Sequence, residues 1–436
     1  MDTKCGGEFW ARGVLMVTEL QIAGMPWLIA AGGVCLALCL GAQFVGDRLG
    51  VMDHPDGDRK RHSGPTPQVG GIAIILSLTV WICALLAGSQ LADGLAPLVT
   101  VLLSATGAGL IGFIDDQSPT TPLARLLSLA VLLGLVFMLL PELIAPAINW
   151  GSFSPTHIPA WAFGLLASFA VIGLVNAVNM ADGQNGIASG MFVVWSVCLM
   201  LVGDPLIATV AYGLLIASLI VLVFNLAGKL FLGDCGTYGV TVVFALLAIM
   251  AHARNEASAE TVALWFLVPV TDCVRLIIAR MLRGRSPADG DRNHLHHHLQ
   301  NEVGMTFSLI SYTGAVAVTS IAGSIAPHYD LFYLASLASL YFGFIYFTSG
   351  GTAPRGEAAT VHTLETGLLL LQRASDFGTT ETGAAVRTPA LAPADCANGL
   401  PETAHLAFEP IQEVVASYPS QESWLQLSEQ LRAGDK

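Results

Sequence analysis

Residues 160–202 read AWAFGLLASFAVIGLVNAVNMADGQNGIASGMFVVWSVCLMLV. Two apolar runs, 160–176 and 187–202, flank a short segment that carries asparagines, an aspartate and glycines. Each run has roughly the length that an α-helix needs to cross a bilayer. Polar groups placed directly against hydrocarbon are costly unless they are paired or used. We therefore expect two membrane helices and, between them, a polar segment that binds something.

The rest of the chain repeats this pattern. It has 436 residues, of which 54% are hydrophobic and only 12% are charged, which is outside the range of ordinary soluble domains. We predict an all-α polytopic membrane protein with about eleven transmembrane helices. The predicted spans are 27–45, 71–88, 96–114, 123–140, 160–176, 187–202, 205–224, 239–252, 261–281, 307–325 and 330–348.

Three parts follow from this pattern. Residues 1–26 form a short N-terminal leader that lacks the basic and apolar regions of a cleavable signal peptide. Residues 27–350 form the transmembrane catalytic domain. Residues 351–436 form a tail whose segment 378–404 is rich in Thr, Ala, Pro and Gly and is typical of a linker, so we expect partial disorder there.

Lysine and arginine residues indicate the orientation, because they gather in cytoplasmic loops. With eleven spans, one set of loops holds only Arg254 beyond the leader, so this side is predicted to be outside. The N-terminus is then outside and the tail is cytoplasmic. The opposite, cytoplasmic set holds Arg48, Arg59, Lys60, Arg61, Arg125, Lys229, Arg275, Arg280, Arg283, Arg285 and Arg292.

Five polar segments all fall on this predicted cytoplasmic side, and the other connections are bland. Chance would scatter polar chemistry over both faces, so we predict a single composite active site. The segments are 53-DHPDGDRKRHSGPTPQVGG-71, 112-GFIDDQSPTT-121, 176-NAVNMADGQNG-186, 225-NLAGKLFLGDCGTYG-239 and 291-DRNHLHHHL-299.

Aspartates at helix ends stand out in these segments. Asp115 and Asp116 follow the third span, where the helix dipole is already negative, so they need a cationic partner unless they only form a hydrated helix end. Asp182 follows the fifth span, and Asn176 and Asn179 share a helical face there; Gly183 closing a helix is the simpler alternative. Asp234 precedes a span, where a helix N-cap is the alternative.

The segment 280–300 carries four arginines and four histidines. Zinc binding is one interpretation, and cytoplasmic anchoring of the basic residues is another. Phosphate binding fits the composition better, since arginine and histidine donate to phosphate oxygens. Carboxylates that face such cations at a membrane surface favour phosphoryl transfer with a divalent ion. There is no Walker loop and no GxGxxG motif, so neither ATP nor a dinucleotide is indicated, and we expect no nucleic-acid partner.

Taken in order, the five segments resemble the polyprenyl-phosphate N-acetylhexosamine-1-phosphate transferase family (glycosyltransferase 4 type) over roughly residues 40–350. The motifs that carry the resemblance are a basic RKRH before Gly70 and Gly71, DD after the third span, NxxNxxDGxxG, NxxxxKxFxGDxG and a histidine-rich loop after DR. The HLHH of residues 294–297 is similar to the N-acetylglucosaminyl branch, whereas the peptidoglycan branch, which transfers phospho-MurNAc-pentapeptide, has a bare LHHHFE.

The resemblance implies that a lipid phosphate attacks the β-phosphorus of a UDP-N-acetylhexosamine and releases UMP. The partners implied are UDP-N-acetylglucosamine or a related sugar nucleotide, undecaprenyl phosphate and the lipid bilayer, with Mg²⁺, or Mn²⁺ in its place, as cofactor. The setting implied is a bacterial inner membrane with a cytoplasmic active site, where the product starts lipid-linked polysaccharides such as lipopolysaccharide O-antigen. A homodimer is a hypothesis.

By position, the resemblance also implies residue roles. Asp115, Asp116 and Asp234 are catalytic, with Asp234 and Asp115 as the metal ligands. The sites expected to bind the nucleotide are Lys60, Asn176, Asn179, Asp182, Asn185 and Phe231. The sites expected to bind the diphosphate or sugar are Arg292, His294, His296 and His297.

Two positions depart from the family pattern. Pro119 stands where an acid or amide is expected, and Asn185 stands where the second acid of DGxDG is expected. The alternatives are a peptidoglycan-type phospho-MurNAc-pentapeptide transferase, a scaffold without activity and a membrane transporter. A transporter would place its polar residues near the middle of the bilayer and often shows two related halves, and neither feature is apparent.

Overall fold

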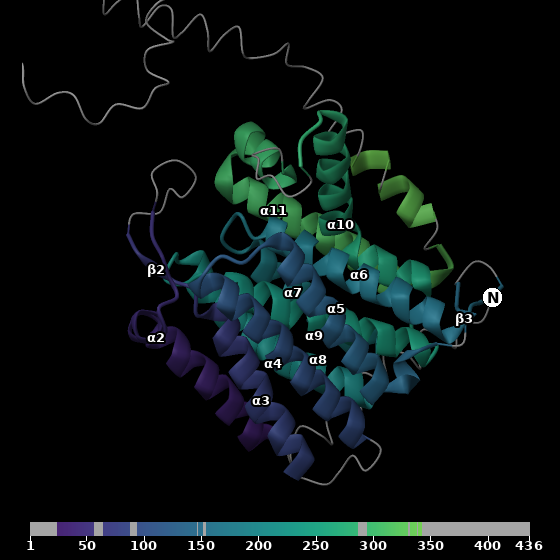
Figure 1. Cartoon of the computed structure of the whole chain (residues 1–436), viewed down its shortest axis with the longest axis horizontal. Coiled ribbons are helices and arrows are strands. Elements are labelled where there is room, and N and C mark those ends of the chain that lie inside the picture. The colour runs from purple at the N-terminus through teal and green to yellow at the C-terminus, as the bar shows by residue number, and fades with distance from the viewer. Residues whose placement is uncertain are drawn as a thin grey trace, which may run out of the picture. The chain divides into compact units, whose positions relative to one another are not determined.

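We describe the protein from a computed structural model (Figure 1). The structure describes residues 24–55, 64–87, 94–145, 147–150, 154–286, 294–329, 332–337 and 339–341. All of them belong to one unit of the chain, Met1–Ala353. Lys60, Arg292, most of the leader and the whole 351–436 tail lie outside the described residues.

The predicted all-α polytopic class is confirmed. By length and composition, 8 helices of the described chain can cross a membrane, or up to 9 if the bent pair Gly24–Leu40 and α2 (Ala42–Leu49) is one span. Two shorter apolar helices are α7 (Ile187–Val202) and Phe332–Tyr341. Every predicted run overlaps one of these helices, but the count of eleven crossings and the sidedness of the termini stay predictions.

The other elements follow in chain order. They are β1 (Met52–Asp53), β2 (Thr66–Pro67), α3 (Gly70–Ala87), α4 (Leu95–Gln117), α5 (Pro122–Leu139), η2 (Pro141–Leu143), β3 (Ala147–Ile148), β4 (Thr156–His157), α6 (Ala160–Ala181), α8 (Pro205–Leu226), α9 (Gly233–Ala253), α10 (Ala259–Leu282), α11 (Leu295–Ile325) and η3 (Pro327–Tyr329).

Local sequence signals set where several helices begin. The side chains of Thr121, Asp204 and Ser258 each accept a hydrogen bond from a backbone N–H in the first turn of α5, α8 and α10. Pro122 and Pro205 directly follow two of these caps, at a position where the missing N–H costs nothing. Side-chain caps and prolines therefore fix these starts within the sequence itself.

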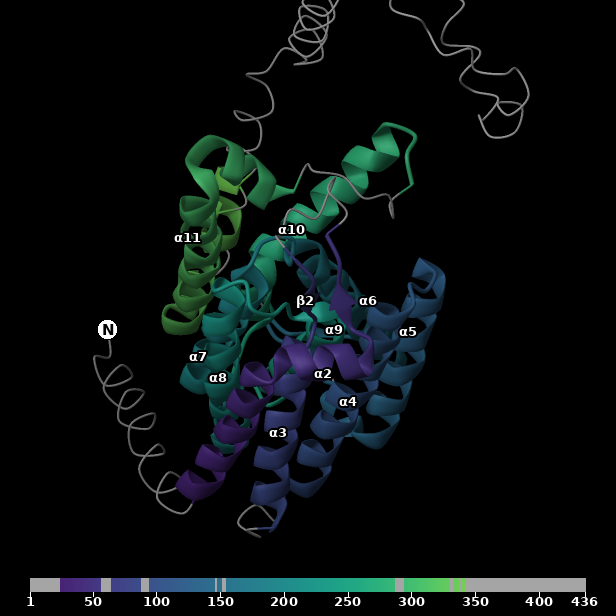
Figure 2. The same cartoon turned by 90° about the vertical axis from the view of Figure 1, so that its left-hand side faces the viewer.

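Helix α9 is the centre of the bundle and is almost wholly buried. It packs against α3, α4, α6 and α7, and Figures 1 and 2 show it among its neighbours. The sequence indicated only a short run at 239–252, because the helix begins with the polar stretch GDCGTYG at Gly233. The polar residues of these first turns belong to the site, so the apolar run begins several residues after the helix does.

Glycines let two helices approach the start of α9 very closely. A Cβ added to Gly71 of α3 would lie 2.1 Å from the backbone of Gly236, and one added to Gly112 of α4 would lie 2.1 Å from the carbonyl oxygen of Asp234. Small residues at such crossings are the usual way for membrane helices to pack backbone against backbone. The position of Asp234 is therefore set by bare backbone contact.

A bent segment and a small hairpin lie beside this region. The helix Gly24–Leu40 meets α2 at 73°, and Figure 2 shows α2 crossing the neighbouring helices. The antiparallel pair β1–β2 follows α2. The backbone N–H of Phe231 donates to the carbonyl of Pro67, and the N–H of Gly70 donates to the carbonyl of Phe231, both at 2.9 Å. The hairpin thus holds the loop that leads into α9.

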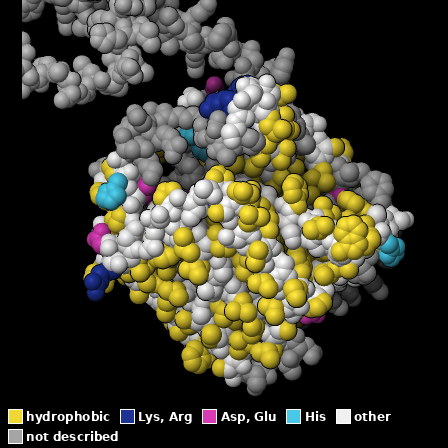
Figure 3. All heavy atoms as spheres, viewed as in Figure 1, with side chains coloured by type: hydrophobic (Ala, Val, Ile, Leu, Met, Phe, Trp, Pro, Cys, Tyr) yellow, Lys and Arg dark blue, Asp and Glu magenta, His cyan; other side chains and the backbone are white. Residues whose placement is uncertain are grey.

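The outer surface is apolar over a broad area. In Figure 3 hydrophobic side chains cover the middle of the visible face, and the charged side chains lie at its margins. Met138 and Phe169 are each 78% exposed. Large exposed apolar areas of this kind are compatible with lipid rather than water. The chain is a multi-pass membrane protein.

Candidate functional site: a carboxylate cluster at the start of helix α9

Asp116 caps the central helix from outside. Its Oδ1 accepts the backbone N–H of Asp234 at 2.8 Å, and its Oδ2 accepts the N–H of Cys235 at 2.9 Å. These amides belong to the first turn of α9, the positive end of that helix. The negative end of α4 at Asp116 therefore meets the positive end of α9. This positive end partly balances the negative charge that the sequence places at the end of α4.

Asp234 does not cap its own helix. Leu232 is the N-cap of α9 and makes no side-chain cap bond, and Asp234 lies within the first turn. The side-chain amide of Asn179 donates to Asp234 Oδ1 at 3.1 Å. Because Asp116 does the capping, the alternative explanation of Asp234 as a structural N-cap does not hold, and its carboxylate is available for other chemistry.

Asp115 is held by basic and polar groups. Its Oδ1 accepts from both the backbone N–H and the hydroxyl of Thr120, each at 2.6 Å, and its Oδ2 pairs with Arg125 at 2.6 Å. The carboxyl groups of Asp115 and Asp234 also lie within hydrogen-bonding reach of each other. Two carboxylates so close together favour a proton or a cation between them.

The segment after α6 is clamped on two sides. Gln184, which is buried, donates to the carbonyl of Met305 at 2.7 Å and accepts from Gln300 and Ser308, so it ties the segment to α11. Asn225 of α8 accepts from the backbone N–H of Gly186 at 2.6 Å. The polar segment 176–186 between the two apolar runs is thus held as a fixed turn.

Asn225 also bridges two parts of the site. Its Oδ1 accepts from the hydroxyl of Ser189 in addition to the N–H of Gly186, while its Nδ2 donates to the carbonyl of Leu230 at 2.9 Å. Gly186 has φ +91°, which a residue other than glycine adopts only with strain. One buried side chain therefore joins the turn after α6 to the loop before α9.

We expect Asn225→Ala to lower the thermal unfolding midpoint of the detergent-solubilised protein by several degrees. It leaves buried N–H and C=O groups without partners, at about 1–3 kcal/mol each. Ser218→Ala is the matched control on the same helix, because the buried Ser218 hydroxyl has no hydrogen-bond partner among the described residues. A similar midpoint for both variants would contradict the bridging role of Asn225.

The histidines at the start of α11 form one cluster. The rings of His294 and His296 stack at 5.4 Å, and His296 lies 4.2 Å from His297 between ring centroids. His296 is almost fully buried, and neither of its ring nitrogens has a hydrogen-bond partner among the described residues. A Cβ added to Gly183 would lie 2.6 Å from His296 Nε2. The cluster therefore packs directly on the DG turn after α6.

Most of the predicted site residues of the described chain meet in this region. Asp115, Asp116, Asp234 and Asn179 are linked by direct polar contacts, and the DG turn brings His296 close to Asp182. Two predicted nucleotide residues lie differently. Asn176 donates to the carbonyl of Ile172 in its own helix at 2.8 Å, and Asn185 lies beside Gly228. The partly buried Phe231 is attached to β2 through its backbone.

Asp182 lies at the end of α6, where burial and then the nearby charge of Asp116 raise the pKa of its carboxyl to about 8. A bound cation or a hydrogen-bond donor on a substrate would favour the charged form and lower this pKa.

Comparison with known proteins places this chain in a family. Residues 98–252 match the model of glycosyl transferase family 4. The chain is 30% identical over 325 residues, 70% of its length and 85% of the relative, to undecaprenyl-phosphate alpha-N-acetylglucosaminyl 1-phosphate transferase of Salmonella typhi. The chain belongs to glycosyl transferase family 4.

Two other family 4 relatives show the range of the similarity. The enzyme of the same name from Escherichia coli strain K12 is 28% identical over 325 residues, with 70% of this chain and 85% of the relative covered. A phospho-N-acetylmuramoyl-pentapeptide-transferase of Staphylococcus aureus is 26% identical over 255 residues, with 54% of this chain and 76% of the relative covered. The resemblance inferred from the motifs is confirmed, and the chain is a family 4 transferase.

The family 4 model covers Asp115, Asp116, Asn179, Asp182 and Asp234, but it ends before the histidine cluster. Sequence reasoning missed Gln184 and Asn225 as organising residues, although both lie inside quoted motifs. It also missed Asp272, because this residue is a single carboxylate within the apolar run of α10. A lone acidic residue in a membrane span is a signal in itself and could have identified it.

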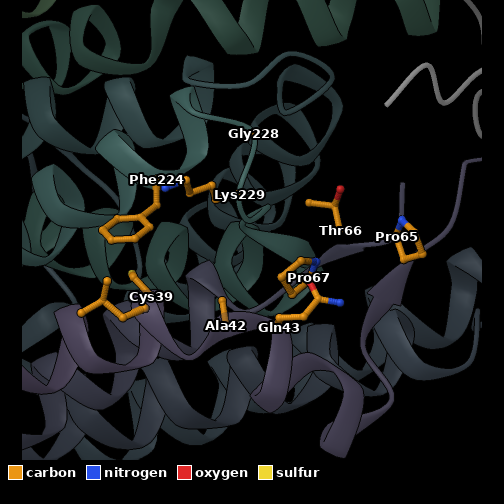
Figure 4. Close-up of a pocket in the computed structure, with 10 residues that line it drawn as sticks. Cys39, Ala42, Gln43, Pro65, Thr66, Pro67, Phe224, Gly228 and Lys229 are labelled. Atoms are coloured by element: carbon orange, nitrogen blue, oxygen red, sulfur yellow. The ribbon is translucent and has the colours of Figure 1, made fainter. Parts of the chain in front are cut away.

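A groove opens beside the family 4 site, where the chain bends before α2. It has a volume of about 360 Å³, and its lining includes Leu40, Gln43, Phe224 and Lys229 (Figure 4). The Lys229 ammonium lies 6.0 Å from the Phe224 ring centroid. Lys229 follows Gly228, which in turn lies beside Asn185. The groove therefore lies between α2 and the segment Gly228–Lys229, which contacts the turn after α6.

Proposed function

We propose that this family 4 transferase moves N-acetylglucosamine 1-phosphate, or a related N-acetylhexosamine 1-phosphate, from a UDP-sugar to undecaprenyl phosphate and releases UMP. The names of the Salmonella and Escherichia relatives support the acceptor and the sugar. In our proposal the site faces the cytoplasm of a bacterial cell, where UDP-sugars are made, and the product starts lipid-linked polysaccharides.

The observation that carries the proposal is the convergence of carboxylates and histidines from distant segments. Asp116 binds the start of α9, Asp234 accepts from Asn179, and the turn after Asp182 touches His296. Phosphoryl transfer relies mainly on positioning and charge stabilisation. The carboxylates could hold a cation, and the ring nitrogens of His296, which have no partner among the described residues, could donate to the oxygens of one diphosphate.

The donor set fits Mg²⁺. No group of three or more His, Cys, Asp or Glu side chains within the described chain is arranged to ligate a metal ion by itself. Mg²⁺ usually takes only one or two carboxylates together with substrate phosphates and water. The close approach of the Asp115 and Asp234 carboxyl groups matches this need. Both Asp115 oxygens are already engaged, so we assign Asp234 as the principal ligand.

When bound, Mg²⁺ would neutralise negative charge on the diphosphate. The chain's own residues supply the rest of the mechanism. Asp115, held by Arg125 and Thr120, would orient the lipid phosphate and accept its proton. An oxygen of that phosphate forms a bond to the β-phosphorus of the UDP-sugar as the bond to the bridging oxygen breaks, and that oxygen leaves with UMP. His294, His296 and His297 would donate to diphosphate oxygens.

The nucleotide would lie against the turn after α6. Asp182 and Asn185 lie on that turn, and Gln184 and Asn225 hold it in place. Phe231 is fixed by its backbone bonds to the segment around β2, which would offer a preformed surface for the uracil. Lys60 and Arg292, both outside the described residues, keep their proposed roles toward the nucleotide and the diphosphate.

The proposal is tested with purified protein in nanodiscs, undecaprenyl phosphate, Mg²⁺ and a panel of UDP-GlcNAc, UDP-GalNAc and UDP-MurNAc-pentapeptide. We expect UMP release with UDP-GlcNAc to exceed release with UDP-MurNAc-pentapeptide by at least about tenfold, a difference of about 1.4 kcal/mol in transition-state stabilisation. Release should require the lipid and stop with EDTA. Absence of UMP with every sugar would contradict the proposal, and preference for UDP-MurNAc-pentapeptide would favour the peptidoglycan-type activity.

A further inference from the structure

A buried carboxylate in α10 has no part in the chemistry proposed above. Asp272 is 3% exposed and lies three residues after Pro269, in a helix that is otherwise largely apolar. An ionisable residue inside a membrane helix is expensive and usually marks a functional site, with a partner that can be named. We therefore expect Asp272 to have a functional role and a specific set of partners.

Four groups from three parts of the chain converge on Asp272. Its Oδ1 accepts from Arg275 of the same helix at 2.8 Å, from the Tyr341 hydroxyl at 2.8 Å and from the backbone N–H of Leu295 at 3.1 Å. Its Oδ2 faces Nδ1 of His294 at 3.4 Å. The carboxylate thus connects α10, the start of α11 and the helix Phe332–Tyr341.

The bond from Leu295 fixes where α11 begins. Leu295 is the first residue of α11, and His294, its N-cap, makes no side-chain cap bond. Asp272 provides the missing acceptor from a neighbouring helix, close to the positive end of α11. The histidine-rich segment therefore takes its position from Asp272.

Asp272 also lies beside the His294 ring, although its Oδ2, 3.4 Å from Nδ1, makes no hydrogen bond with it in this structure. A carboxylate near Nδ1 favours a proton on that nitrogen and leaves Nε2 as the other polar atom of the ring. The His294 ring stacks on His296, whose nitrogens have no partner among the described residues. The distance of 3.4 Å is longer than a well-formed hydrogen bond, and such contacts often tighten only when the substrate is bound.

We propose that Asp272 is a positioning residue that acts through His294 to align the histidine cluster with the diphosphate of the sugar nucleotide. This inference rests on the proposed function, because it assumes that the cluster binds a diphosphate. It differs from a simpler role in which Asp272 only neutralises Arg275, with which it forms an ion pair at 2.8 Å.

The test compares ligands that do and do not carry the second phosphate. We expect Asp272→Asn to raise the KM for UDP-GlcNAc and the dissociation constant for UDP by about 10- to 100-fold, the range for one hydrogen bond to a charged group. UMP should bind within about twofold of the unmodified protein, because its single phosphate would not reach the cluster. A merely structural loss would weaken UMP and UDP binding equally and would overturn the proposal.

Two further variants keep the outcome decisive. If Asp272 only balances Arg275, the double variant Asp272→Asn with Arg275→Gln should restore UDP binding, whereas the positioning role predicts no rescue. His294→Gln should show the same selective loss of UDP binding and add little to Asp272→Asn. If Asp272→Asn does not fold, His294→Gln alone decides, and equal loss of UMP and UDP binding there would overturn the proposal.

The failure of this inference can be told apart from the failure of the proposed function. Binding of UDP and UMP is measured by thermal stabilisation of the full chain and does not require turnover. A protein that makes no UMP but shows the selective UDP effect would contradict only the proposed reaction. A protein that makes UMP and binds UDP normally after Asp272→Asn would contradict only the positioning role.

Discussion

Asp234→Asn is expected to reduce UMP release by about 1,000-fold or more, which corresponds to about 4 kcal/mol of transition-state stabilisation. The change keeps the size of the side chain and an oxygen that can accept from Asn179, but it removes the negative charge. The measurement is UMP release from purified protein over a range of Mg²⁺ concentrations, together with the amount of protein recovered from membranes.

Asp47→Asn provides the control for this variant. Asp47 is an exposed aspartate of α2, so its replacement should leave UMP release unchanged. Normal recovery of Asp234→Asn with lost activity would support a role in chemistry. Activity within about threefold of the unmodified protein would remove Asp234 from the catalytic site, and the Mg²⁺ assignment with it.

The second large effect concerns the packing around Asp234. Gly112→Ala should lower the thermal unfolding midpoint and reduce UMP release more than tenfold, because the new methyl group would lie 2.1 Å from the carbonyl oxygen of Asp234. The obstacle is backbone, so α4 and α9 must move apart, and overpacking of this kind costs about 1–3 kcal/mol or more. The same movement displaces the Asp234 carboxylate.

Gly173→Ala is the matched control for Gly112→Ala. Gly173 is also a glycine within a membrane helix, α6, and a methyl group there would meet nothing within 4 Å. Its replacement should leave the unfolding midpoint and activity almost unchanged or slightly raise the midpoint, because alanine favours helix more than glycine does. Equal behaviour of the two variants would show that the close α4–α9 crossing does not set the site.

Much of the fold was predictable because it depends on hydrophobicity and length. The apolar runs at 71–88 and 205–224 correspond closely to α3 and α8. The predicted run at 239–252 was too short because α9 begins at Gly233 with polar residues that serve the site. The bend of 73° before α2 could not be predicted, because a hydropathy pattern reports how apolar a segment is and not the angle between two helices.

The site was predictable as a set of segments but not as a network. The family resemblance implied a catalytic role for Asp116, yet only the structure shows that its oxygens cap α9. The N-cap interpretation of Asp234 was locally sound, and it fails because the cap comes from another helix. Asp272 and Asn225 act across long sequence distances, and a single sequence contains no information on which distant groups meet.

The departures from the family pattern also gain a structural context. Pro119 lies next to Thr120, whose backbone N–H and hydroxyl both donate to Asp115. The Asp115 carboxylate is thus held by two donors of Thr120, directly after the position 119 at which the family pattern has an acid or amide. Asn185 lies on the turn after α6, with its side-chain amide beside Gly228.

The central claim is that a single diphosphate is bound between the start of α9 and the histidine cluster of α11. A cryo-EM map of the protein with Mg²⁺ and UDP-GlcNAc measures this directly. We predict density for the two phosphates in contact with Asp234 on one side and with His296 or His297 on the other. Density for the two phosphates in the groove beside Lys229, or in any cavity that reaches only one of the two groups, would contradict the account.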